Sequence, residues 1–251
     1  MIQLTIIKIQ DYGPWTLTLG SDREHRLQIL QASIYKELQK LFSEKNGIVF
    51  LNRSDEFFAV TNGITLDDHI KIQKELKKLF DLKLIMSIGI ADNPFDANFK
   101  AYESKKYNHY LDKNYDIFGV IDGKEEQKIT IIHLDVDNIT STGNTKSPYE
   151  ISSTIFNLYS KMSEFFLIQN SITFFMGGDN FMIVTSDKGK ESVKEFLKQV
   201  KKENDITLNC GIGSAQNARE AIRLATKSLD TIREIRDSGD KAPEIYELSC
   251  S

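Results

Sequence analysis

Apolar residues follow two kinds of spacing along the chain, and the two kinds alternate. Short runs rich in Ile, Val and Phe predict β-strands, for example 4–10 (LTIIKIQ) and 129–135 (ITIIHLD). In 23–45 and 148–169 the apolar residues return every three or four positions, which predicts amphipathic helices. Strands and helices are therefore expected to alternate throughout the chain and to form sheets covered by helices.

Similar segments within the chain indicate an internal duplication. The segment 48–61 (IVFLNRSDEFFAVT) resembles 172–185 (ITFFMGGDNFMIVT), and 87–97 (SIGIADNPFDA) resembles 211–221 (GIGSAQNAREA). Both pairs lie 124 residues apart, and the two opening strands lie 125 residues apart. Three blocks in one order at nearly one spacing predict a tandem repeat of about 125 residues per unit.

Each unit has the predicted order β-α-β-β-α-β-α-β, which contains the ferredoxin-like pattern of an antiparallel sheet with helices on one face. We therefore expect an α+β protein with a first domain at 1–121, a polar linker at 122–128 (DGKEEQK) and a second domain at 129–251. The expected second helices cover 66–80 and 191–203, and the expected final strands cover 115–121 and 243–248.

Composition narrows the class of protein. The chain has 251 residues, of which 40% are hydrophobic and 27% charged, as in ordinary globular proteins. Its formal net charge of −4 argues against nucleic acid as the main partner, and no apolar run reaches the length of a membrane helix. The 2 cysteines and 4 histidines form no CxxC pair and no HExxH motif, which argues against a zinc enzyme of the usual kind. A cytoplasmic protein with no membrane partner is expected.

Carboxylates follow the opening strand of the second unit and lie in its hairpin. Asp135 and Asp137 end the strand, and Asp179 follows Gly177 and Gly178 in the turn. Because the first strand and the hairpin are neighbours in a βαββ sheet, Asp135 and Asp179 are expected side by side. Each feature alone also fits an ordinary turn or helix cap. Together they favour a site for a hard cation such as Mg²⁺, whose preferred ligands are oxygens and phosphates.

These motifs resemble those of the palm-type nucleotidyl cyclase domain of the GGDEF class. The chain reads DVDNI at 135–139 and GGDNF at 177–181, with Asn180 where that class has Glu. The class also has a helix with the pattern A-D-x-A-L-Y-x-A-K, and 225–233 of this chain reads ATKSLDTIR. Arg233 stands at the phosphate-binding Lys of that pattern, although a solvated helix charge is an equal alternative.

Further motifs resemble the GTP cyclohydrolase III family over essentially the whole length. They are YGPWT at 12–16, two palm-like units in one short chain, and the GGDNF hairpin in the second unit. The resemblance implies an enzyme that takes GTP as substrate and opens its guanine imidazole ring. The implied product is 2-amino-5-formylamino-6-ribosylamino-pyrimidinone 5′-monophosphate, with two inorganic phosphates. It further implies two Mg²⁺ ions, help from a monovalent cation such as K⁺, a homo-oligomer, and a role in flavin and deazaflavin synthesis.

The resemblance also implies roles for residues of the second unit. Asp135 and Asp179 would hold metal together with the Val136 carbonyl, and Asp137 would be a ligand of a second metal. We expect Asp135, Asp137 and Asp179 to be the catalytic residues. The residues expected at the nucleotide are Asn138, Ile139 and Thr140, through backbone N–H groups, and Gly177, Gly178, Asn180 and Arg233.

The first unit departs from this pattern. The similarity of the opening strands aligns Gln10 with Asp135, so metal binding in the first unit is open. Arg53 replaces a glycine of the hairpin and, with Asp55, is a candidate nucleotide contact; an ion pair between these two residues is as good an interpretation. His109 aligns with Arg233, and His133 is expected to be a buried core histidine.

Two other functions are compatible with the motifs. A nucleotidyl cyclase would make a cyclic nucleotide, but the missing acid at Asn180 and the fused first unit argue against it. A degenerate nucleotide sensor would bind without turnover, but the intact Asp135, Asp137 and Asp179 argue against that. Which residue activates the water, and which residues contact guanine, stay open.

Overall fold

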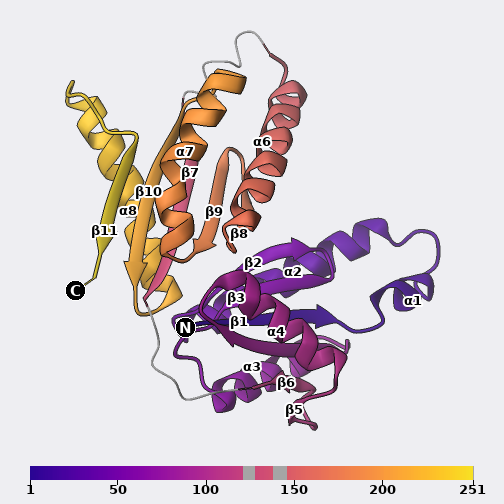
Figure 1. The fold of residues 1–251 in the computed structure, drawn as a ribbon. Coiled ribbons are helices and arrows are strands. Elements are labelled where there is room, and N and C mark those ends of the chain that lie inside the picture. Colours follow the sequence, from indigo (N-terminus) through magenta and orange to yellow (C-terminus); the bar gives the residue numbers. More distant parts are fainter. Residues whose placement is uncertain (121–127, 138–145, 251) are drawn as a thin grey trace. The chain divides into compact units, whose positions relative to one another are not determined.

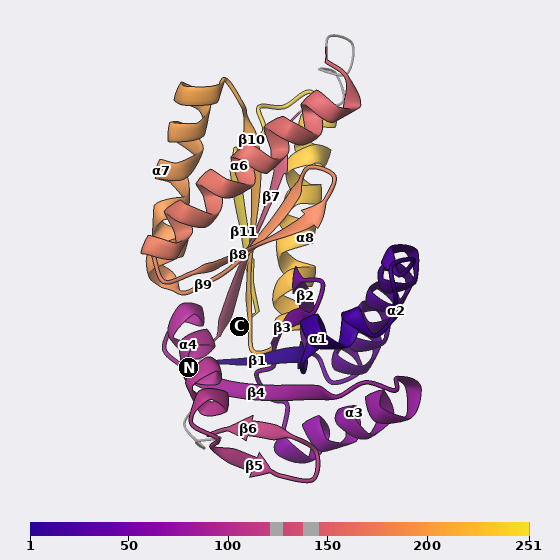
Figure 2. The same cartoon turned by 90° about the vertical axis from the view of Figure 1, so that its right-hand side faces the viewer.

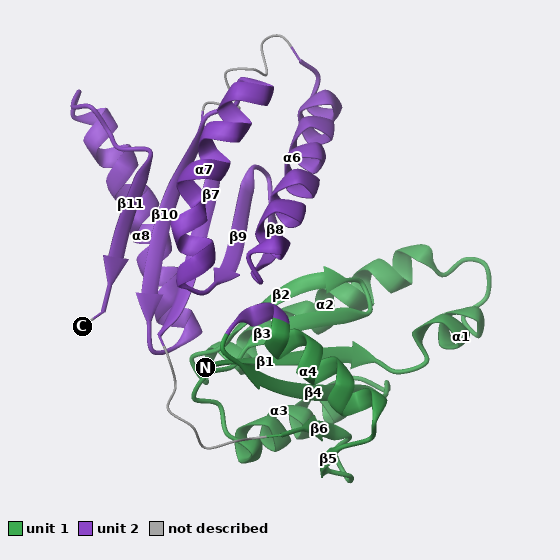
Figure 3. Ribbon diagram, in the orientation of Figure 1, with its two compact units in different colours: residues 1–92, 96–126 green, residues 93–95, 127–251 purple. Residues whose placement is uncertain are grey.

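A computed structural model describes residues 1–120, 128–137 and 146–250. The chain divides into two compact units, shown in different colours in Figure 3. Unit 1 comprises 1–92 and 96–126, and unit 2 comprises 93–95 and 127–251. Each unit is built around its own sheet (Figure 1).

Unit 1 has a six-stranded sheet with the order β2-β3-β1-β4-β6-β5. Its elements in chain order are β1 (Ile2–Ile9), α1 (Tyr12–Leu17), α2 (Glu24–Ser43), β2 (Ile48–Arg53), β3 (Glu56–Val60), α3 (Leu66–Leu79), β4 (Leu84–Ala91), α4 (Pro94–Lys106), β5 (Tyr110–Asp112) and β6 (Ile117–Gly119). The short elements α1 and β5 were not expected from the pattern of apolar residues.

Unit 2 has a five-stranded sheet with the order β11-β10-β7-β9-β8. Its elements are β7 (Ile129–Val136), α6 (Pro148–Ile168), β8 (Ile172–Gly177), β9 (Asn180–Thr185), α7 (Asp187–Asn204), β10 (Leu208–Ala215), α8 (Ala218–Asp237) and β11 (Ile245–Ser249). Local sequence explains where these helices begin: Ser147 caps α6 in a capping box with Glu150, and the Asn217 side chain caps α8.

The fold class predicted from the sequence is confirmed, because each unit has the order of elements expected for a ferredoxin-like domain. The expected helices correspond to α2, α3, α6 and α7, with ends that differ by at most a few residues. The final strands pair in parallel, β6 with β4 and β11 with β10, so that both sheets are mixed at one side. The expected linker, 122–128, lies almost wholly outside the described residues.

The two helices of the ferredoxin-like core of unit 2, α6 and α7, pack on one face of its sheet, as expected, and the third helix, α8, covers the other face. In unit 2, Cys210 and Ile212 pack in a core with α6 and α7. Gly211 and Gly213 alternate with them and face α8. Figure 2 shows α8 on the opposite side of the sheet from α7. A Cβ on Gly213 would lie 2.1 Å from the Ala221 carbonyl oxygen, so only glycine lets α8 pack this closely.

The strand register shows which residues of the two opening strands are equivalent. This equivalence differs from the alignment that sequence similarity suggests. Lys8 of β1 lies opposite Glu56, and Asp135 of β7 lies opposite Asn180. Glu56 and Asn180 are equivalent, because they stand at the same place after the two hairpin turns. Lys8 therefore occupies the position of Asp135, and the alignment of Gln10 with Asp135 is wrong by two residues.

Backbone hydrogen bonds support the corrected register. The N–H of Gln10 donates to Lys83 O in unit 1, and the N–H of Asp137 donates to Thr207 O in unit 2. Gln10 is thus the counterpart of Asp137. None of the helices that the structure describes is long and apolar enough to cross a membrane.

Candidate functional site

The end of β7 and the β8–β9 turn meet at one edge of the unit 2 sheet. Asp135 is the penultimate residue of β7, with only 8% of its surface exposed, and it lies opposite Asn180. The next residue, Val136, donates its N–H to the Asp179 carbonyl oxygen at 3.4 Å. The strand order therefore brings Asp135 and Asp179 together, as the sequence predicted.

The turn itself is built by two glycines with positive φ, 99° at Gly177 and 62° at Gly178. Residues with side chains rarely adopt this conformation. Apart from the chain neighbours of each glycine, no atom of the described residues lies within 4 Å of where its Cβ would stand. The turn thus leaves open space beside Asp179 that a phosphate or nucleotide can approach.

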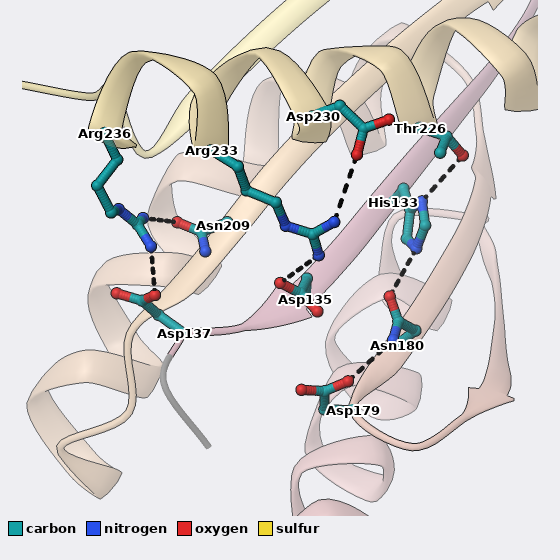
Figure 4. A network of polar contacts seen from close by, with 10 residues as sticks. All are labelled: His133, Asp135, Asp137, Asp179, Asn180, Asn209, Thr226, Asp230, Arg233 and Arg236. Atoms are coloured by element: carbon teal, nitrogen blue, oxygen red, sulfur yellow. Dashed lines mark hydrogen bonds and ion pairs between the residues drawn. The ribbon is translucent and has the colours of Figure 1, made fainter. Parts of the chain in front are cut away.

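Arg233 reaches this edge from α8 and pairs with Asp135. Its Nη2 donates to Asp135 Oδ2 at 2.9 Å, and its Nη1 donates to Asp230 Oδ1 at 3.3 Å (Figure 4). The Asp135 carboxylate raises the pKa of Arg233 further above its ordinary value. Arg233 therefore brings a permanent positive charge to the carboxylates, and the view of it as only a solvated helix charge is wrong.

A second arginine of α8 holds Asp137. Arg236 Nη1 donates to Asp137 Oδ1 at 2.6 Å, and Nη2 donates to Asn209 Oδ1 at 2.8 Å. Asn209 is buried at the start of β10. The guanidinium fork thus ties the end of β7 to β10, and Figure 4 shows this pair apart from Asp135 and Asp179.

Asp179 differs in its partners from the other two carboxylates of this edge. In the part of the chain that the structure describes, no cationic side chain forms an ion pair with it. Burial and the neighbouring Asp135 carboxylate raise the pKa of Asp179 above its usual range. A partly buried carboxylate beside another is a group that a bound cation would stabilise.

Behind Asp179, a chain of hydrogen bonds leads into the sheet. Asn180 Nδ2 donates to Asp179 Oδ1 at 2.9 Å, and Asn180 Oδ1 lies 3.0 Å from His133 Nε2. His133 Nδ1 lies 3.3 Å from the Thr226 hydroxyl of α8. His133 is buried, and burial lowers its pKa, so it is neutral at pH 7. The expectation of a buried histidine is confirmed, and the side chain also reaches the candidate site.

Some of the side chains at this edge are suitable ligands for a hard cation, and others are not. Among residues 1–120, 128–137 and 146–250, no three His, Cys, Asp or Glu side chains gather closely enough to hold a metal ion. Asp135 and Asp179 supply neighbouring carboxylate oxygens, the type of ligand that Mg²⁺ prefers. Asp137 is turned to Arg236. The predicted nucleotide contacts Asn138, Ile139 and Thr140 lie outside the described residues.

At the equivalent edge of unit 1, the charged side chains form ion pairs with one another. Lys8 Nζ lies 3.4 Å from Glu56 Oε2, and Arg53 lies 3.6 Å from Asp55 and 3.4 Å from Glu56. The ion pair between Arg53 and Asp55 that the sequence left open is thus present. A cation stands here where unit 2 has its first carboxylate.

The predicted counterpart of Arg233 in unit 1 is not on a helix. Helix α4 ends at Lys106, and Asn108 follows with a φ of 55°, a conformation that ends helices. His109 therefore lies beyond the helix, and its N–H donates to the Ser104 carbonyl oxygen. His109 and Arg233 thus correspond in the sequence repeat, but they do not occupy equivalent positions in the structures of the two units.

Several residues of the site were not predicted from the sequence. Arg236 and Thr226 lie three residues after and seven residues before Arg233, so a helical pattern places them on the same face of α8. That spacing was available as a signal. Asn209 and the link from His133 to Asn180 depend on the strand register, for which no local signal exists.

The comparison with known proteins agrees with this geometry. Residues 1–242 match the model of a protein family described as GTP cyclohydrolase III. The chain belongs to the GTP cyclohydrolase III family. A relative named GTP cyclohydrolase III from Methanocaldococcus jannaschii is 34% identical, and the match covers 93% of this chain and 88% of the relative. The relative of that name from Methanothermobacter thermautotrophicus is 32% identical, with 93% and 95% covered.

Among solved structures, similar chains include cyclase domains. The active GGEEF domain of a diguanylate cyclase from Vibrio cholerae matches with a TM-score of 0.37 and 17% identity, over 50% of this chain and 85% of that chain. A bacterial light-regulated adenylyl cyclase matches with a TM-score of 0.39 and 13% identity, over 94% of this chain and 83% of that chain.

Proposed function

We propose that this protein is a Mg²⁺-dependent GTP cyclohydrolase that opens the imidazole ring of guanine. The proposed products are 2-amino-5-formylamino-6-ribosylamino-pyrimidinone 5′-monophosphate and two inorganic phosphates. One water adds at C8 and leaves the formyl group on the product, and one further water is consumed for each phosphate released. The observation that carries the proposal is the family match over residues 1–242, together with the meeting of Asp135, Asp179 and Arg233 at one edge of a sheet.

The proposed cofactor is Mg²⁺, two ions in all, with K⁺ as a helper. Asp135 and Asp179 would hold one ion with the Val136 carbonyl, and Asp137 would serve a second. Bound there, Mg²⁺ supplies Lewis-acid chemistry: it neutralises phosphate charge and lowers the pKa of a bound water. The raised pKa of Asp179 supports this assignment, because its main causes are burial and the neighbouring Asp135 carboxylate.

The side chains of the chain have their own roles in the proposal. Arg233 would exchange Asp135 for a phosphate oxygen of GTP, since its guanidinium is held at the same edge. Gly177 and Gly178 leave room for the triphosphate beside Asp179. Asn180 carries an amide that can contact the nucleotide or orient its neighbour. Arg53 and Asp55 of unit 1 stay candidates for nucleotide contacts.

The wider setting is part of the proposal. We infer a homo-oligomer in the cytoplasm that supplies an opened pyrimidine nucleotide to flavin and deazaflavin synthesis. Gel filtration with light scattering tests the oligomer. A molar mass equal to that of one 28.7 kDa chain would contradict it.

The decisive experiment follows the ultraviolet spectrum of GTP incubated with the protein and Mg²⁺, together with a phosphate assay. The expected result is loss of the purine band, release of phosphate, and a product mass that retains the formyl group. An unchanged purine band with release of pyrophosphate would indicate a nucleotidyl cyclase instead. Binding of GTP without any product would indicate a sensor. Heat-denatured protein with the same metal content is the control.

A further inference from the structure

The hydrogen-bond chain from α8 to Asp179 has a fixed direction. The Asp179 carboxylate only accepts hydrogen bonds, so Asn180 must present its NH₂ group there. The Asn180 carbonyl then faces His133 at 3.0 Å, and His133 Nε2 must carry the hydrogen. His133 Nδ1 is left as an acceptor for the Thr226 hydroxyl. Each polar atom in this series of hydrogen bonds is thus assigned as either a donor or an acceptor.

The opposite orientation of the Asn180 amide is unfavourable. It would place the carbonyl oxygen against the Asp179 carboxylate and the NH₂ group against His133 Nε2–H. The first contact would join two acceptors and the second would join two donors. Both lie in a partly buried setting, where polar groups without a hydrogen bond are costly. Asp179 and the Nε2–H tautomer of His133 therefore favour the same orientation of the amide, and that orientation provides the donor to Asp179. The Thr226 hydroxyl completes this tautomer as a donor to Nδ1.

An acid at position 180 could not make this link. A carboxylate accepts from His133 but has no hydrogen to donate to Asp179, and it would add a second negative charge beside it. Unit 1 provides an internal comparison. There the equivalent residue is the acid Glu56, which is held by Lys8 and Arg53, and the register places Ile6 at the position of His133. The amide and the histidine thus occur together in unit 2 only.

The hairpin turn needs such a support. Gly177 and Gly178 have positive φ, and beyond their chain neighbours no described residue packs where their side chains would stand. The turn is therefore held mainly by the strand ladder, and in the described residues Asn180 is the side chain that donates to the Asp179 carboxylate. His133 belongs to β7 and bonds to Thr226 of α8, and both elements are well packed.

We propose that His133, through the Asn180 amide and with Thr226 behind it, is a positioning residue that sets the orientation of the Asp179 carboxylate. The inference rests on the proposed function only in taking Asp179 to be a cation ligand. His133 touches neither the substrate nor the cation. Its effect is to hold one carboxylate oxygen of Asp179 with the amide, so that the other oxygen points away from Asn180, as Figure 4 shows.

The test measures Mg²⁺ affinity in the absence of nucleotide. The variant His133→Leu removes the donor to Asn180 and should weaken Mg²⁺ binding by about tenfold, as loss of a hydrogen bond to a metal ligand typically does. His133→Gln presents an N–H near the place of Nε2 and should restore most of the affinity. Asn180→Leu removes the donor without adding a charge, and should weaken binding at least as much as His133→Leu.

A matched control lies in the same unit. Thr173 of β8 has a buried hydroxyl without a hydrogen-bond partner in the described structure, so Thr173→Val should leave Mg²⁺ affinity unchanged. Thermal unfolding of each variant checks the fold. If His133→Leu does not fold, Asn180→Leu still tests the donor to Asp179, because position 180 is only partly buried.

A spectroscopic readout is independent of metal and activity. Nitrogen-15 NMR of the wild-type protein should show His133 as the neutral Nε2–H tautomer, with slowed exchange of the Asn180 side-chain amide. The Nδ1–H tautomer would overturn the proposal, as would wild-type Mg²⁺ affinity in both His133→Leu and Asn180→Leu. If the wild-type protein binds Mg²⁺ with this pattern of variants but leaves GTP intact, the positioning role stands and the proposed function fails.

Discussion

Arg233 of α8 and Asp135 of β7 form an ion pair at 2.9 Å, and thereby join the expected phosphate-binding residue to an expected metal ligand. The Asp135 side chain is buried, whereas about half of the Arg233 side chain is exposed. The guanidinium therefore has a route to solvent and to a ligand, while the carboxylate stays in place. A cation that binds Asp135 must compete with Arg233, and a phosphate that binds Arg233 removes this competition.

This competition predicts opposite effects of Arg233→Ala on the two ligands. Mg²⁺ affinity without nucleotide should rise, because Asp135 loses its competing partner. The value of kcat/KM for GTP should fall about tenfold or more, because a charge-assisted contact to phosphate is lost. Isothermal titration and steady-state kinetics measure the two effects. Arg223→Ala is the matched control, since Arg223 lies on the same helix and pairs with Glu220. A parallel loss of both affinities would contradict the competition.

Asp179→Asn should abolish Mg²⁺-dependent turnover of GTP and leave the fold intact. The side chain keeps its shape, and its raised pKa means that the charge costs stability near Asp135 at neutral pH. The midpoint of thermal unfolding at pH 7 should therefore not decrease. A variant that turns over GTP at the wild-type rate would show that the metal assignment is wrong.

Asp55→Asn, the equivalent change in unit 1, should leave the Mg²⁺ stoichiometry per chain unchanged. In unit 1 the place of Asp135 is taken by Lys8, and Asp55 already faces Arg53. Titration of Mg²⁺ into Asp55→Asn and Asp179→Asn, side by side, measures the difference. Loss of a bound ion in Asp55→Asn would reveal a metal in unit 1.

The sequence predicted the meeting of Asp135 and Asp179 because strand order alone determines it. The order β-α-β-β makes the first strand a neighbour of the hairpin, whatever the exact register. The correspondence of Lys8 with Asp135 was missed for a physical reason. Side chains alternate between faces with a period of two, so a shift by two residues keeps every apolar side chain on its face. The apolar pattern therefore carries no information about such a shift.

The contacts of the α8 arginines with the carboxylates could not be predicted from the sequence, for a different reason. The last turns of α8 carry Arg233 and Arg236, whereas α4 stops at Lys106, before the equivalent turns. Similar sequences thus differ in helix length, and the signal for the earlier end is the single residue Asn108. The arginine contacts also cross from helix to strand, and such long-range partners leave no spacing along the chain.

The buried histidine of unit 1 predicts how stability depends on pH. His69 of α3 is fully buried, bonded to Thr5 and Thr65, and burial lowers its pKa from 6.5 to about 4. Between these two pH values, the unfolded chain binds a proton at His69 and the folded protein does not. Unfolding is thus favoured as pH falls from 6.5 to 4, with a total loss of about 3 kcal/mol.

Urea unfolding between pH 4.5 and 7.5 measures this loss, and the fluorescence of Trp15, the single tryptophan, reports on unit 1. In His69→Gln the free energy of unfolding should depend much less on pH across this window, because the amide does not titrate. His25→Gln is the control, since His25 is 59% exposed and its removal should keep the wild-type slope. A wild-type slope in His69→Gln would assign the pH dependence to other groups.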